Sequence, residues 1–117
     1  MEQTTIDQIE KLLSLSETDI LINIGREVDS GIYAFPPTPK ELIDKANSWW
    51  NYSKKTIIKE ICFSEKVCEA IRSEDKIVLY AAILDVLSGI ISGVSPVTAS
   101  ALVIKKGIEK LCESYWR

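Results

Sequence analysis

The sequence predicts an all-α protein: a compact bundle of five to six helices in a single domain over residues 1–117, with an antiparallel C-terminal helical hairpin. Apolar residues recur at spacings of three and four along most of the chain, and no run alternates as a strand does. Ser, Thr or Asp residues stand before these patterns, where helix N-caps are expected. Five Gly and four Pro leave little room for the turns of an all-β fold. A chain of 117 residues can bury one core and is too short for two ordinary domains.

The first two helices are predicted from their capping signals. Thr5–Gln8 has the form of a capping box and begins a helix over about residues 5–15. Ser16–Asp19 begins a second helix, which Asp29–Gly31 ends because glycine readily adopts the left-handed conformation. Residues 32–37 contain two prolines, so we expect an extended connector whose aromatic side chains pack on the core.

The clearest helix start in the chain is at Thr38. Thr38 can cap, Pro39 suits the first helical position, and Glu41 can bond back to the cap. A third helix follows, and Ser53 is expected to begin a fourth. Phe63–Ser64 marks a local break within that fourth helix.

The C-terminal third predicts two long apolar helices. Ser73–Asp75 begins one that runs to about Ile91, and because it is apolar around most of its circumference it is expected to be the central helix. Ser95–Pro96 begins the next, whose apolar stripe continues to Tyr115. The joint between them is short, so the two helices should pack antiparallel.

A stretch without charge, residues 86–104, is close to the length of about 20 residues that a membrane span needs. Gly93 and Ser95–Pro96 interrupt it, and the helical stripe continues past Lys105 on the far side. We therefore interpret the stretch as part of a soluble core and not as a membrane span.

The three cysteines are expected to be reduced thiols of an intracellular, cytoplasmic protein. Cys62, Cys68 and Cys112 are an odd number without a C-x-x-C pair, which argues against a disulfide framework and against a zinc site. Cys62 and Cys68 are six residues apart and would lie about 240° apart around one helix, too far to pair. The acidic start of the chain does not resemble a secretory signal.

Little in the sequence points to catalysis. The chain has no histidine, which removes the most frequent general base and metal ligand, and it has no phosphate-binding loop. No catalytic, cofactor-binding or metal-binding residue is predicted, and an enzyme built on Glu41, Asp44 or Asp85 has no supporting spacing.

Asp85 is the one acid in the apolar run. It could be a buried functional carboxylate, but we expect a hydroxyl, a lysine or solvent to satisfy it at the rim of the bundle.

The candidate partner-binding residues are aromatic: Trp49, Trp50, Tyr52 and Trp116. Adjacent tryptophans on a helix point about 100° apart, so one should enter the core and the other stay half-exposed. Lysines follow the first three, but no nucleic-acid partner is expected. The net charge is −3, and there is no broad basic stripe: residues 1–31 carry seven acids and two bases, residues 32–72 seven bases and five acids.

The function predicted from these observations is a non-enzymatic helical module that binds a protein partner or associates with itself, for instance as a homodimer. A mean hydropathy of +0.07 is high for a domain this small to cover alone, and self-association hides apolar surface. The alternative is a membrane-active protein whose apolar hairpin, residues 77–104, inserts into a bilayer on a trigger. Membrane contact is the less favoured of the two.

Overall fold

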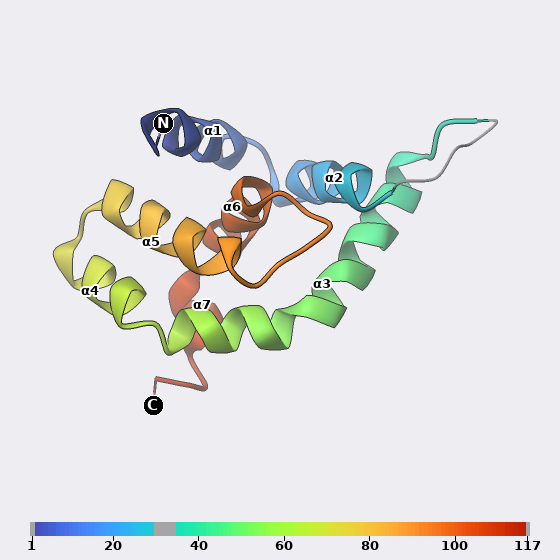
Figure 1. Cartoon of the computed structure of the whole chain (residues 1–117). Coiled ribbons are helices and arrows are strands. Elements are labelled where there is room, and N and C mark those ends of the chain that lie inside the picture. The colour runs from blue at the N-terminus through green and yellow to red at the C-terminus, as the bar shows by residue number, and fades with distance from the viewer. Residues whose placement is uncertain (1, 30–34, 117) are drawn as a thin grey trace.

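The computed structural model describes residues 2–29 and 35–116, and all regular secondary structure in these residues is α-helical (Figure 1). The helices in chain order are α1 (Glu2–Leu13), α2 (Glu17–Val28), α3 (Pro39–Cys62), α4 (Glu65–Ser73), α5 (Lys76–Ser88), α6 (Pro96–Lys106) and α7 (Ile108–Cys112). This confirms the predicted all-α bundle, although the described residues form seven helices and not the five to six expected. The loop 89–95 turns the chain back, so that α5 and α6 pack against each other as the C-terminal hairpin.

Most helices begin where the sequence predicts, because an N-cap is a local signal. The exception at the start of the chain is α1, which begins at Glu2 and not at the capping box predicted at Thr5. In five helices the cap side chain accepts a hydrogen bond from a backbone N–H in the first turn, which satisfies a donor that the helix itself leaves unpaired. These caps are Ser16, Thr38, Ser64, Asp75 and Ser95. The Thr38 hydroxyl, for example, lies 3.2 Å from the Glu41 nitrogen.

Helix α3 corrects the prediction that a new helix begins at Ser53. It is continuous for 24 residues from Pro39 to Cys62, because the buried positions Trp50, Ile57 and Ile61 keep helical phase across Ser53. The break expected near Phe63 is confirmed: α3 ends there and Ser64 caps α4. The long helix forms one edge of the molecule (Figure 1).

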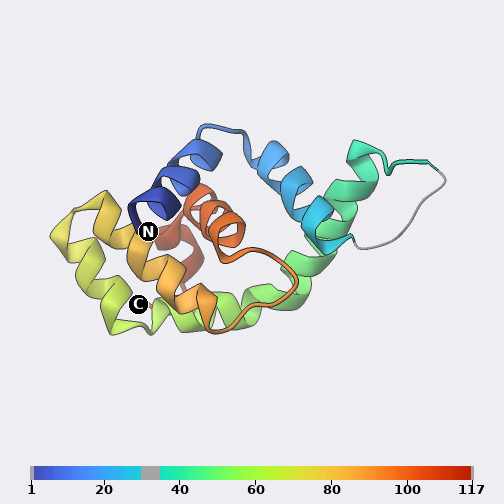
Figure 2. The same cartoon turned by 45° about the horizontal axis from the view of Figure 1, so that its top comes forward.

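Helix α6 is the central helix, and the prediction that α5 takes this place is wrong. Residues 98–103 are all buried, and α6 packs against α1, α2, α5 and α7 (Figure 2). Three of them, Ala99, Ser100 and Ala101, are small and allow neighbours to approach from several sides. Helix α5 carries larger apolar side chains, but it lies at the outside of the bundle and leaves Ile77 49% exposed.

A single helix from residue 96 to Tyr115, expected from the apolar stripe, is not formed. Gly107 has φ +99°, a conformation that side-chain-bearing residues rarely adopt, and it ends α6 and starts α7. Ile108 is still buried, as the stripe predicts, but the change of direction carries Cys112 to the end of α3.

The connector before α3 also differs from the prediction. Phe35 does not pack on the core; its side chain is 82% exposed. The other aromatic residue of the connector, Tyr33, and the expected cap Gly31 lie outside the described residues.

Both ends of α6 are held by residues from the N-terminal helices. The Glu27 carboxylate accepts hydrogen bonds from the Ser95 nitrogen (2.6 Å) and the Thr98 hydroxyl (2.7 Å), at the end of the helix that favours negative charge. At the other end, Lys106 pairs with Glu17 at 3.1 Å. These contacts fix α2 across the central helix.

Helices α2 and α3 approach each other closely at Gly25. A Cβ atom added at Gly25 would overlap the backbone carbonyl of Leu42, and a backbone atom cannot rotate away as a flexible side chain can. The glycine is therefore required by the helix contact.

Gly25→Ala is expected to lower the free energy of unfolding by about 1–3 kcal/mol, because α2 must move away from α3. The direction of this change in the free energy of unfolding is informative, because an unobstructed alanine would instead stabilise the helix by about 1 kcal/mol over glycine. Urea denaturation measures the change. Gly89→Ala, at the C-cap of α5, is the control for the added methyl group, because the nearest atom to its added Cβ is 3.7 Å away. A Gly25→Ala protein as stable as the wild type would contradict the close contact.

Ser100 is a second position where a substitution tests the packing. Its side chain is fully buried, and its hydroxyl has no hydrogen-bond partner among the described residues. We expect Ser100→Ala to raise the free energy of unfolding by about 1 kcal/mol, because an unpaired buried hydroxyl is removed at little change in volume. Thermal denaturation measures it. Thr98→Val removes the hydroxyl that donates a hydrogen bond to Glu27, so it should lower the free energy of unfolding.

Candidate interaction surface

One face of α3 carries an exposed row of two lysines flanked by two aromatic residues, which we call the aromatic–basic stripe. Tyr52, Lys55, Lys59 and Phe63 follow one another at spacings of three, four and four, which places them on one side of the helix axis. Tyr52 is 89% exposed and Phe63 is 63% exposed. The opposite side of α3, which includes Ile57, packs into the core, so the stripe faces solvent.

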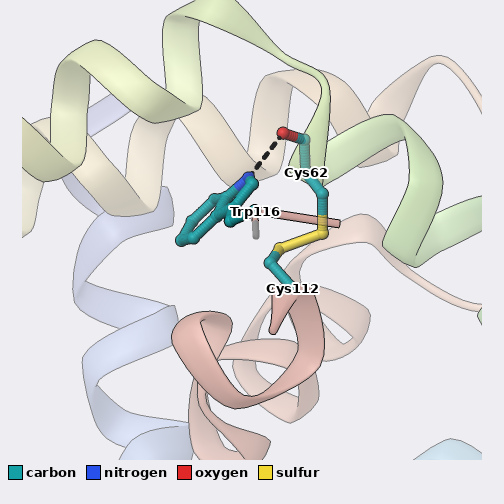
Figure 3. The surroundings of a disulfide bond; sticks show 3 residues. All are labelled: Cys62, Cys112 and Trp116. Atoms are coloured by element: carbon teal, nitrogen blue, oxygen red, sulfur yellow. Dashed lines mark hydrogen bonds between the residues drawn. A yellow bond between two sulfur atoms is a disulfide. The ribbon is translucent and has the colours of Figure 1, made fainter. Parts of the chain in front are cut away.

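The C-terminal segment is fastened to the end of α3 beside this stripe. Cys62 and Cys112 form a disulfide with their Cα atoms 5.5 Å apart. The Trp116 indole N–H donates a hydrogen bond to the Cys62 carbonyl at 2.8 Å, and Figure 3 shows the indole and the disulfide together below the end of the helix. The rings of Phe63 and Tyr115 meet edge to face at 5.4 Å between centroids.

The disulfide corrects the prediction that all three cysteines are reduced thiols. Cys68, six residues after Cys62, does remain unpaired, although the two cysteines lie on different helices, α4 and α3, and not on one. The true partner, Cys112, is 50 residues away and reaches α3 because Gly107 redirects the chain. An odd number of cysteines does not exclude one bridge and one half-buried thiol.

A groove lies between α3 and the C-terminal segment, with a volume of about 510 Å³, open to solvent. We call it the α3–tail groove. Its lining residues are Trp50, Lys54, Lys55, Ile58, Leu111, Ser114 and Tyr115. None of them is acidic. Lys54, Lys55 and, one turn on, Lys59 form no ion pair with another of the described residues.

The four predicted partner-binding residues do not form one surface. Trp50 is 8% exposed and belongs to the core, with the Lys106 ammonium 5.2 Å from its ring, while Trp49 is half-buried. This confirms that one of the adjacent tryptophans enters the core. Trp49 and the exposed Tyr52 line a smaller depression of about 180 Å³, and Trp116 lies against α4, where it shares a third depression with Cys68.

Asp85 lies at the rim, as expected. Its carboxylate is 64% exposed and 2.7 Å from the Lys66 ammonium, so it is satisfied by a lysine and by solvent. Glu41 and Asp44 are exposed on the first turns of α3, a different helix from Asp85. Over residues 2–29 and 35–116, no cluster of three or more His, Cys, Asp or Glu side chains is arranged to hold a metal ion.

Sequence reasoning missed Phe63 and the groove. The spacing of the aromatic–basic stripe is present in the sequence, but it is recognisable only when α3 is known to continue through Ser53. The groove depends on the position of Leu111 and Tyr115 beside α3, which the turn at Gly107 and the disulfide determine.

Comparison of the chain with protein-family models, with curated proteins and with solved structures finds no match. Within the described part of the chain, no helix combines the length and the apolar character that crossing a membrane requires. Function has to be argued from the surface itself.

Proposed function

We propose that the chain is a non-enzymatic interaction module that binds a protein partner, or a second copy of itself, through the aromatic–basic stripe and the adjoining α3–tail groove. The observation that carries the proposal is the 89% exposure of Tyr52 on a long helix whose end is anchored by a disulfide. Tyrosine and tryptophan are enriched among the residues that dominate binding energy at interfaces, and a rigid support lowers the ordering cost of association.

Site-specific photocrosslinking tests the proposal in cells that produce the chain. A photoreactive amino acid at Tyr52 should give discrete protein adducts, either with a second copy or with another protein. The same amino acid at Asn47, an exposed position on the same helix, is the control and should not. Phe63→Ser should reduce the adducts at position 52. The absence of adducts specific to position 52, together with a monomer in sedimentation at micromolar concentration, contradicts the proposal.

The membrane-active alternative gains no specific support from the fold. Insertion of residues 77–104 would require α6 to leave the core, where residues 98–103 are buried, and to break the bonds from Ser95 and Thr98 to Glu27. Flotation with neutral and anionic vesicles, at neutral pH and in mild acid, tests it. A chain that floats with the vesicles would favour the alternative.

The cytoplasmic location expected from the sequence stays a prediction. The Cys62–Cys112 disulfide bears on it, because such bonds persist in oxidising compartments and are rare in the cytosol. Acid quenching of the cells followed by alkylation of thiols in denaturant tests it, because Cys112 is buried and would not react in the folded chain. Alkylation of Cys112 would support a reducing compartment, and protection of Cys112 until a reductant is added would contradict it.

A further inference from the structure

We propose that the α3–tail groove recognises an acidic peptide segment that carries apolar side chains as anchors. This inference rests on the proposed interaction function and names the chemistry of its partner.

The floor and walls of the groove suit an apolar anchor. Trp50, Ile58 and Leu111 are its apolar lining, and its volume of about 510 Å³ can take large side chains of a partner. One wall is α3 and the other is α7 with the residues after it, and the Cys62–Cys112 disulfide joins the two. The groove is therefore formed before a partner arrives, which reduces the entropy lost on binding.

The positive charges at the rim of the groove favour an acidic partner. Lys54 and Lys55 lie at the rim, Lys59 follows, and the lining holds no carboxylate that could neutralise them. The hydroxyls of Ser114 and Tyr115 add donors for a carboxylate oxygen. Aspartate and glutamate side chains in the partner would complete these interactions, whereas a basic segment would be repelled.

Two other polyanions fit the groove less well. Stacking of single-stranded bases needs an accessible aromatic face. Of the two aromatic rings in the lining, Trp50 is 8% exposed with the Lys106 ammonium over its ring, and Tyr115 already meets Phe63 edge to face. A planar bilayer surface does not reach apolar residues that lie between two helical walls. A peptide can place one side chain on the floor while its carboxylates stay at the rim.

Fluorescence anisotropy of a labelled model peptide tests the inference with the full chain and its disulfide intact. The probe is a peptide of about 15 residues with Leu and Phe at every third or fourth position and Glu elsewhere, as for an amphipathic helix in a groove. We expect saturable binding that weakens as salt is added. A peptide of the same pattern with Lys in place of Glu should not bind.

Matched charge variants localise the binding. The double variant Lys54→Glu, Lys55→Glu should raise the dissociation constant of the acidic peptide about tenfold or more. Lys40→Glu with Lys76→Glu changes the net charge equally, but both lysines are in first helical turns away from the groove, where acids are well tolerated. Leu111→Ser should weaken binding with the charges unchanged, and far-UV circular dichroism verifies its fold.

Several outcomes would overturn the inference. An equal loss in the two charge variants would mean that net charge and not the groove attracts the peptide. Binding of an oligothymidine or of anionic vesicles with the same dependence on Lys54, Lys55 and Leu111 would assign the groove to a different partner class. Crosslinks at Tyr52 without peptide binding would remove this inference and leave the proposed function standing.

Discussion

Replacement of both Cys62 and Cys112 by serine is expected to lower the free energy of unfolding by about 4 kcal/mol, a large fraction of the stability of a domain this size. The bond closes a loop with a sequence separation of 50 residues, and most of its effect comes from the freedom that the unfolded chain regains when the loop opens. Urea denaturation of the variant, and of the wild type with and without a phosphine reductant, measures the change.

The loss should not be confined to the covalent bond. The Trp116 hydrogen bond to Cys62 and the contact of Tyr115 with Phe63 both depend on the C-terminal segment staying beside α3. Without the disulfide, these contacts must hold the segment alone. Tryptophan fluorescence and amide exchange at the C-terminus should therefore change at denaturant concentrations below the main transition.

Cys68→Ser is the control for this prediction, because Cys68 is not part of the bridge. It should leave the free energy of unfolding nearly unchanged. Unreduced protein in denaturant should titrate with one thiol, and protein treated with a reductant should titrate with three. Three thiols before reduction, or equal stability of the two forms, would contradict the disulfide.

The parts of the fold that could be predicted from the sequence are those with local causes. Thr38 and Ser95 predict the starts of their helices, because a cap needs only a side chain and the N–H groups two or three residues further along the chain. The exposure of Asp85 and the burial of one tryptophan follow from helical geometry at 3.6 residues per turn. Such features need no knowledge of the rest of the chain.

The parts that could not be predicted depend on residues that are distant in sequence. Cys112 meets Cys62 only after Gly107 has redirected the chain, and glycine alone does not reveal which conformation it adopts. The groove combines α3 with residues after 110, so no single segment contains its pattern. Of the candidate site, the aromatic residues Trp50 and Tyr52 could be named in advance, but the groove beside them could not.

The identity of the central helix shows why hydrophobicity alone is a poor guide to burial. Helix α5 is the more apolar of the two C-terminal helices, yet only Ala82, Ile83 and Leu87 of it are buried. Helix α6 buries all of residues 98–103, because small side chains let its neighbours approach closely. How closely neighbours can pack against a helix depends on side-chain size as well as on polarity.

The same substitution in the two helices tests this reversal. Leu102 in α6 is fully buried, and Leu84 in α5 is half-buried. Leu102→Ala should lower the free energy of unfolding by about 3–4 kcal/mol, because it removes apolar contacts and leaves a cavity that the surrounding helices cannot fill. Leu84→Ala should cost about 1 kcal/mol, since part of the side chain is already in water and its neighbours can relax.

Both changes replace leucine by alanine within a helix, so intrinsic helix propensity nearly cancels in the comparison. Urea denaturation measures both losses, and they can be compared directly when the free energy of unfolding of the two variants falls with urea at the same slope. Equal costs, or a larger cost at Leu84, would place α5 at the centre of the core and would remove the packing on which the position of α7, the disulfide and the α3–tail groove depends.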